Sequence, residues 1–168
     1  MKSDIKLSVV LTTCFGLLFS KLAFCSVTTS ILPVNTVVTA NCSMNSALLN
    51  FGDYNPILAN KNAPLDAMTT FVIQCTKGAN VTISMNNGLY AGNANQTTRA
   101  MADGAGNYIS YELYSNSGRS SIWNNANPVS FISASSTARN QAVYGRVPGA
   151  QSVSAGTYRD TVTITAAF

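Results

Sequence analysis

Residues 155–168 read AGTYRDTVTITAAF, and this final stretch decides the fold class. Its apolar and aromatic side chains share one parity, at Tyr158, Val162, Ile164, Ala166 and Phe168. Threonine occupies the alternate positions 161, 163 and 165. A period of two with threonines on the alternate positions is typical of a β-strand that buries one face and exposes the other. The stretch therefore predicts a final β-strand with one face in a hydrophobic core.

The same alternation recurs through the chain. Its members are Leu32, Val34, Val38, Ala40 and Cys42; Leu49 and Phe51; Phe71, Ile73 and Cys75; Val81, Ile83 and Met85; Ile109, Tyr111 and Leu113; and Val143, Gly145 and Val147. Stretches rich in Asn, Gly and Ser separate these segments, for example residues 86–98 and 115–121. No long run has the 3.6-residue period of a helix. About seven short strands with this pattern predict an all-β fold, an antiparallel β-sandwich.

The two ends of the chain leave two interpretations open. A final strand with no strand after it leaves one sheet edge unpaired and an open hydrophobic groove beside it. A strand from another chain then completes the sheet, which is β-augmentation by donor-strand complementation. The alternative is a self-contained sandwich in which the chain's own N-terminal stretch, Ser26 to Asn35, closes that edge.

The first 25 residues have the pattern of a secretory signal peptide. Lys2 and Lys6 form a positive start, and the largely apolar residues 7–19 follow. Ala23 and Cys25 are small residues at the −3 and −1 positions of a cleavage before Ser26. Lys21 interrupts the apolar run too early for a membrane-spanning helix and leaves the cleavage position open.

Charge and composition exclude several classes of function. The sequence has no histidine, so it has no His general base, Ser-His-Asp triad or His-ligated metal site. Cleavage of residues 1–25 leaves seven basic and five acidic residues, which lowers the net charge from +4 to +2. The basic residues are dispersed, so no phosphate-binding patch for nucleic acid is expected. We expect no enzyme activity, cofactor, metal ion or small-molecule substrate.

The cysteines indicate an oxidising compartment. Cys14 and Cys25 lie in the predicted signal peptide, and Cys42 and Cys75 remain as an even pair. A disulfide between them closes a loop of about 34 residues, for which the chain-entropy model gives roughly 4 kcal/mol of stabilisation. No C-x-x-C spacing is present, which argues against zinc and thioredoxin-like redox sites.

Several ordered segments together resemble the spore coat protein U domain family, which includes the archaic chaperone–usher pilins. The segments are VTANC (38–42), LNFGDY (49–54), FVIQCT (71–76), RAM (99–101), YELY (111–114), Trp123, VYGRVP (143–148) and AGTYRDTVT (155–163). Each segment is weak alone, but they occur in order over essentially the whole mature chain. Asn124 departs from the pattern, because the family commonly has Gly after this Trp.

The resemblance implies an incomplete immunoglobulin-like sandwich that lacks its last strand. Residues 36–168 are then the pilin domain, and Ser26 to Asn35 is the donor segment. Ile31, Leu32 and Val34 are the side chains expected to insert. Val162, Ile164, Ala166 and Phe168 are expected to line the groove, with the carboxylate of Phe168 anchored to the chaperone. Cys42–Cys75 matches the family disulfide.

The resemblance also implies the partners and the destination of the chain. A periplasmic chaperone first lends a strand to the groove, and at an outer-membrane usher the next subunit replaces it. The expected product is an extracellular fimbria, a polymer of neighbouring pilus subunits used in adhesion and biofilm formation. The rival interpretations are a spore- or cell-coat structural protein of the same family and a secreted soluble binding module or adhesin.

A few other motifs have simpler structural interpretations. Residues 103–107, DGAGN, contain a G-x-G but predict a tight hairpin turn, because no strand–helix–strand unit surrounds them. Tyr108, Tyr111, Tyr114 and Trp123 have rings that can stack on a sugar, yet Tyr111 and Trp123 are expected in the core or at an edge. Arg99, Arg146, Arg159 and Asp160 are expected to be solvated or to form structural ion pairs.

Overall fold

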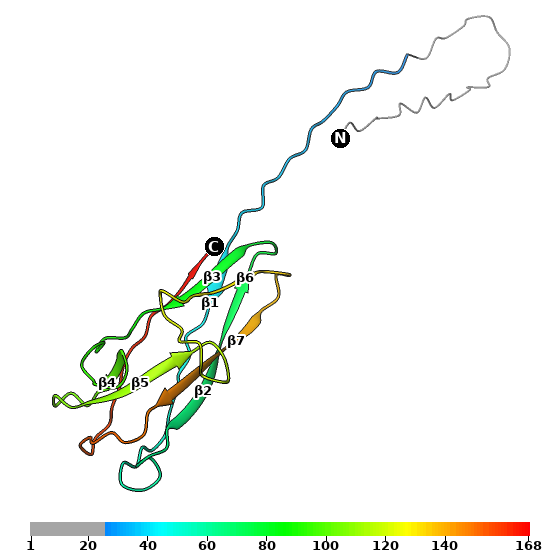
Figure 1. The fold of residues 1–168 in the computed structure, drawn as a ribbon. Helices are drawn as coiled ribbons and strands as arrows, with labels where there is room; N and C mark the ends of the chain where they lie inside the picture. The colour runs from blue at the N-terminus through cyan, green and yellow to red at the C-terminus, as the bar shows by residue number, and fades with distance from the viewer. Residues whose placement is uncertain (1–25) are drawn as a thin grey trace, which may run out of the picture. The chain divides into compact units, whose positions relative to one another are not determined.

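The computed structural model describes residues 26–168, so the predicted signal peptide, residues 1–25, lies outside the described residues. Residues 37–168 form one compact unit. Its secondary structure consists of eight β-strands, and no described residue is helical. Accordingly, the described part of the chain contains no helix long and apolar enough to cross a membrane. The prediction of an all-β antiparallel fold is confirmed (Figure 1).

Five strands form the larger sheet, in the order β1-β2-β7-β5-β4, and all neighbours are antiparallel. Their bounds are β1 Cys42–Met44, β2 Leu65–Cys75, β4 Arg99–Ala102, β5 Tyr108–Tyr114 and β7 Arg139–Val147. The predicted hairpin turn at residues 103–107 joins β4 to β5. The Asp103 carboxylate accepts hydrogen bonds from the backbone N–H groups of Ala105 and Asn107 and so fixes that turn.

Three strands form the smaller sheet, in the order β6-β3-β8. Their bounds are β3 Asn80–Met85, β6 Val129–Ile132 and β8 Ile164–Ala167. The central strand β3 is antiparallel to both neighbours. The alternating residues Val81, Ile83 and Met85 of β3 are buried, as their period of two predicts.

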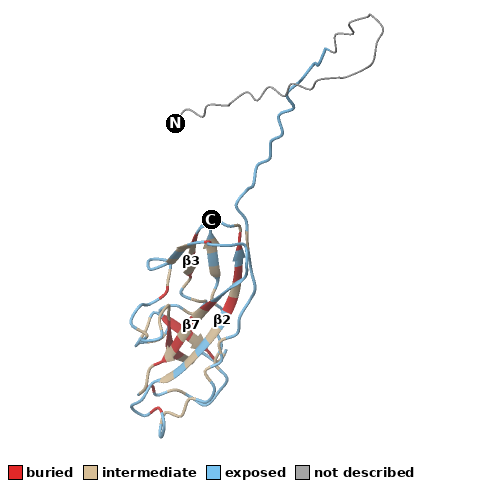
Figure 2. Cartoon of the chain, turned by 90° about the vertical axis from the view of Figure 1, so that its right-hand side faces the viewer, coloured by how far each residue is buried: buried red, intermediate tan, exposed pale blue. Residues whose placement is uncertain are grey.

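The core lies between the two sheets and is filled by the inward parity of each strand (Figure 2). Phe71 and Trp123 are fully buried with ring centroids 6.2 Å apart. Trp123 also donates from Nε1 to the Ile83 carbonyl at 2.9 Å, which satisfies its only polar group. Tyr111 and Trp123 are therefore core residues, as predicted.

The predicted disulfide is present between Cys42 and Cys75. The two residues are also direct cross-strand partners in the β1–β2 ladder. The bond therefore ties β1, a strand of only three residues at the edge of the larger sheet, to the long strand β2. Three residue pairs alone would hold β1 only weakly to β2. The disulfide fixes the position of β1 and so the start of the segment that follows it.

Two expected strands are shorter than the alternation predicts. The pattern at residues 32–42 becomes a strand only at Cys42, and residues 26–41 have exposed side chains without regular structure. The final strand begins at Ile164 rather than at Tyr158. The segment before β8 contacts the larger sheet first. There Arg159 and Ala102 of β4 exchange two backbone hydrogen bonds. The segment then crosses to the smaller sheet, where β8 pairs with β3.

Candidate functional site

A long apolar cavity of about 690 Å³, which we call the groove, opens between the edges of the two sheets. One wall is residues 47–51, which continue from the edge strand β1. The other wall is residues 157–164, which lead into the edge strand β8. The apolar side chains that line the groove come from both walls and from the core beneath: Leu48, Leu49, Phe51, Met85, Met101, Tyr111, Leu113, Val143, Val162 and Ile164.

The first wall rests on a glycine. Leu49 and Phe51 are partly buried against the core, and Phe51 meets Tyr111 edge-on with ring centroids 6.0 Å apart. A Cβ built on Gly145 of β7 would lie 2.6 Å from Leu49 Cδ2 and 2.7 Å from Phe51 Cζ. Gly145 therefore provides the space into which the two side chains of this wall pack.

Gly145→Ala is expected to destabilise the folded chain by about 1–3 kcal/mol, because the added methyl group overpacks the site of Leu49 and Phe51. Urea unfolding followed by Trp123 fluorescence measures the loss. Gly118→Ala is the matched control, since a Cβ there meets its nearest atom at an ordinary 3.5 Å. Equal midpoints for the two variants would contradict this account of the wall.

The second wall alternates in burial along its length. Tyr158, Asp160, Val162, Ile164 and Ala166 are partly buried, while the residues between them are exposed. The groove-facing parity is therefore the one read from the sequence. Because none of these positions is fully buried, the apolar face of this wall is incompletely packed by the described residues.

The backbone of β8 has one open edge. Asn86 N donates to the Thr163 carbonyl at 3.0 Å, so residues 163, 165 and 167 direct their backbone groups toward β3. The alternate residues 162, 164 and 166 then direct theirs toward the groove side. Within residues 26–168, β8 pairs with β3 alone. The groove thus combines apolar side chains with a free row of backbone donors and acceptors.

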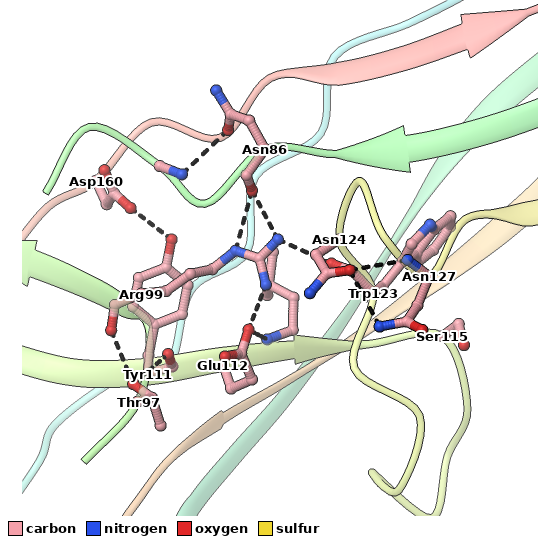
Figure 3. A network of polar contacts seen from close by, with 12 residues as sticks. Asn86, Thr97, Arg99, Tyr111, Glu112, Ser115, Trp123, Asn124, Asn127 and Asp160 are labelled. Carbon is pink, nitrogen blue, oxygen red and sulfur yellow. Dashed lines mark hydrogen bonds and ion pairs between the residues drawn. The ribbon is translucent and has the colours of Figure 1, made fainter. Parts of the chain in front are cut away.

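Asp160 anchors the second wall to the rest of the fold (Figure 3). Its carboxylate accepts from the Tyr111 hydroxyl at 2.6 Å and from the Leu89 backbone N–H at 2.8 Å. Burial, and then the hydrogen bond to Asp160, raises the pKa of Tyr111 well above its usual range, so the phenol remains a donor. A Cβ on Gly88 would lie 1.9 Å from Asp160 Oδ2, so a glycine is required beside this carboxylate.

A buried cation joins three elements and bonds to the chain neighbours of two groove-lining residues, Met85 and Tyr111 (Figure 3). Arg99 is fully buried and forms an ion pair with Glu112 of β5. Its guanidinium also donates to the Asn86 carbonyl at 2.6 Å and to the Trp123 carbonyl at 2.8 Å. Arg99 is thus one of the predicted structural ion pairs. It ties the end of β3, β5 and the loop that carries Trp123 together.

The predicted site residues are distributed unevenly. Val162 and Ile164 line the groove, and Ala166 packs against the core beside it. Phe168 lies outside the groove lining and is 54% exposed. The predicted donor residues Ile31, Leu32 and Val34 are 91%, 84% and 85% exposed. Such exposed apolar side chains in one short segment are unusual unless a partner covers them.

Sequence reasoning missed the first wall of the groove. Leu49 and Phe51 form an alternating pair and part of a family motif, but neither feature of the sequence assigns them to the groove. Their segment has no regular strand pairing, so tertiary packing against the core, including Gly145 and Tyr111, places them. The usable signal was the glycine itself, which interrupts the apolar parity of Val143 and Val147.

Comparison with known proteins agrees with this architecture. Among solved structures, a chain of the CsuC–CsuE chaperone–tip adhesion subunit pre-assembly complex, from archaic chaperone–usher Csu pili of Acinetobacter baumannii, is similar with a TM-score of 0.56 and 26% identity. The similarity covers 78% of this chain and 40% of that chain, so the chain spans less than half the length of its structural neighbour.

Sequence comparison gives the family. Protein U of Myxococcus xanthus is 36% identical over 139 residues, which cover 76% of this chain and 77% of that protein. The family model for the Spore Coat Protein U domain matches residues 28–165, which include all eight strands except the last two residues of β8. The chain belongs to the spore coat protein U domain family.

Proposed function

We propose that the chain is a structural subunit of an archaic chaperone–usher fimbria and assembles by donor-strand exchange. The observation that carries the proposal is the groove: an apolar channel flanked by the open backbone edge of β8. An extended strand is the ligand that fits both features, because its alternate side chains fill apolar space while its backbone joins the ladder. The role is structural, and no reaction is assigned to the groove.

The proposed occupant is the N-terminal segment, residues 26–35, of a second copy or of a related subunit. This segment has no regular structure, and its apolar side chains are exposed. Burial of each Leu, Val or Ile side chain contributes roughly 1.5–3 kcal/mol, and every new backbone pair satisfies an edge group of β8. The same burial gives assembly a driving force that needs no nucleotide.

The geometry of a strand decides which side chains enter. Successive side chains point to opposite faces, so Leu32 and Val34 enter together while Ile31 points away. Val38 has the parity of Leu32 and Val34 and extends the apolar face in the C-terminal direction. We therefore assign Leu32 and Val34 to the groove and Ile31 to the outer face of the completed sheet.

A periplasmic chaperone and an outer-membrane usher are the proposed assembly partners. The support is the similarity to a chain of a chaperone–tip adhesion subunit pre-assembly complex. A chaperone strand would occupy the groove first and keep its apolar lining from aggregating. The destination is then the cell surface, with residues 1–25 as the export signal and the fibre serving adhesion and biofilm formation.

Deletion of residues 26–35 tests the proposal. The truncated chain retains every groove residue, so it is expected to accept a strand but not to donate one. Electron microscopy and unboiled SDS gels should then show no fibres and no ladder of multimers. A chain with residues 26–35 replaced by a Gly/Ser segment of equal length is the control for spacing and should fail in the same way. Normal fibres from either variant would overturn the donor assignment.

A second candidate function is a cell-coat structural protein. The observation that favours it is the 36% identity to Protein U of Myxococcus xanthus, which exceeds the identity to the Csu chain. Both functions use the same groove. They differ in the partner expected during export. A fimbrial subunit is expected to be purified from the periplasm with a bound chaperone, and a coat protein is expected without one. Recovery of the chain without a chaperone, together with a surface coat in place of fibres, would favour the coat function.

A further inference from the structure

A second concavity of about 450 Å³, which we call the polar cavity, lies among the loops around the β4–β5 hairpin. It is lined by residues 93–96, 106–108 and 150–154, together with Ser110 of β5. The groove and the polar cavity share no lining residue. Its volume falls within the range of about 300–1,000 Å³ usual for small-molecule sites.

The back of the polar cavity is rigid. Gln151 is buried, and its side-chain amide exchanges two hydrogen bonds with the backbone of Ser110, at 2.7 and 3.0 Å. Its Nε2 also donates to the Pro148 carbonyl, and its backbone N–H donates to the Tyr54 hydroxyl. The loop of residues 150–154 is therefore fixed to β5 at its base, and the cavity is formed before any ligand arrives.

The front of the polar cavity presents polar groups without partners. Within residues 26–168, the side chains of Asn93, Asn95 and Ser152 and the hydroxyl of Tyr108 make no hydrogen bond. Two amides supply donors and acceptors, and the hydroxyls can act as either. Asn93, Asn95 and Ser152 are exposed and Tyr108 is half-buried, so in the free chain these groups face water and are accessible to a ligand.

Charge and aromatic character narrow the class of ligand. No Lys, Arg, Asp or Glu lines the polar cavity, so an ionic ligand would find no counter-charge there. Tyr108 forms one side, and its ring is packed against Tyr90 with centroids 6.0 Å apart. An aromatic ring held in place beside neutral amides and hydroxyls suits the C–H face and hydroxyl edge of a sugar ring.

We propose that the polar cavity binds a neutral saccharide. Asn95 and Ser152 hydrogen-bond sugar hydroxyls, and the Tyr108 ring contacts an apolar face of the sugar. The cavity lies outside the groove, so saccharide binding and strand exchange are separate properties of the same chain. A fibre built from such subunits would present one saccharide site for each copy.

The test is saturation-transfer NMR on the mature chain, residues 26–168. The probes are glucose, galactose, mannose and N-acetylglucosamine, with N-acetylneuraminic acid as the anionic comparison. At least one neutral sugar is expected to receive saturation, and the acid is not. Asn95→Ala with Ser152→Ala is expected to weaken binding of that sugar by about 10-fold or more, because two hydrogen bonds are lost.

Asn125→Ala is the matched control, since Asn125 is an exposed loop asparagine outside the polar cavity. This variant should bind the sugar as the parent chain does, and circular dichroism should show all variants folded. Absence of transfer to all four neutral sugars would overturn the proposal, as would equal binding by the double variant. A chain lacking residues 26–35 should keep the saccharide signal, which separates this test from that of strand exchange.

Discussion

Replacement of Leu32 and Val34 by aspartate in one chain is expected to abolish assembly into fibres. In the proposed complex both side chains lie against the apolar side chains of the groove, where a carboxylate would lose part of its hydration. The lost burial of the Leu32 and Val34 side chains alone removes roughly 3–6 kcal/mol of association free energy. The fold of the chain itself should not change, because both residues are exposed in the unassembled subunit.

The measurement is the ladder of unboiled multimers on SDS gels together with electron microscopy of surface fibres. Thr29→Asp with Asn35→Asp is the matched control, because it adds the same two charges on the opposite parity of the strand. This control is expected to assemble. A third variant, Ile31→Asp, reports which face enters, and it should resemble the control. Fibres from the Leu32 and Val34 variant would show that these side chains do not enter the groove.

Arg99→Met is expected to lower the free energy of unfolding by about 3–5 kcal/mol, since removal of one partner leaves a buried charge unpaired. Glu112 would lose its counter-ion, and the carbonyl groups of Asn86 and Trp123 would lose their donor. Asn86 and Glu112 are the chain neighbours of Met85 and Tyr111, which line the groove. The same variant is therefore also expected to weaken strand binding, because these lining residues would be held less firmly.

Urea unfolding measures the effect, and Arg146→Met is the control. Arg146 forms an ion pair with Asp66 at 2.7 Å, but the side chains of both are about one-third exposed. A pair so accessible to water is worth no more than about 1 kcal/mol. Arg99→Met combined with Glu112→Gln should recover part of the loss, because no unpaired charge then remains. Equal destabilisation by the Arg99 and Arg146 variants would contradict the buried role of Arg99.

Local periodicity predicted the parts of the fold that depend on alternation. Val81, Ile83 and Met85 are buried, and Val162 and Ile164 lie on the partly buried parity of the last segment, because a strand that buries one face must alternate. The oxidising compartment and the even number of cysteines outside the signal peptide predict the Cys42–Cys75 disulfide. These features need only local sequence, and the structure agrees with each of them.

Tertiary packing decided the parts that the sequence did not predict. Residues 38–41 alternate like a strand, but Thr39 and Asn41 bond only to Thr76, beyond the end of β2, so the regular ladder begins at Cys42. The exposed position of Phe168 depends on where β8 ends relative to β3, which no local pattern encodes. The first wall of the groove depends on Gly145, and the polar cavity depends on three loops that are distant in sequence.

The central claim is that the groove accepts the N-terminal segment of another copy. A synthetic peptide of residues 26–38 added to the mature Leu32→Asp, Val34→Asp chain tests it most directly, because this chain has an intact groove and a defective donor. Thermal unfolding followed by circular dichroism should show a melting temperature that rises with peptide concentration, as ligand linkage requires. The same peptide with both aspartates should give no rise. A melting temperature unchanged at every concentration of the natural peptide would contradict the claim.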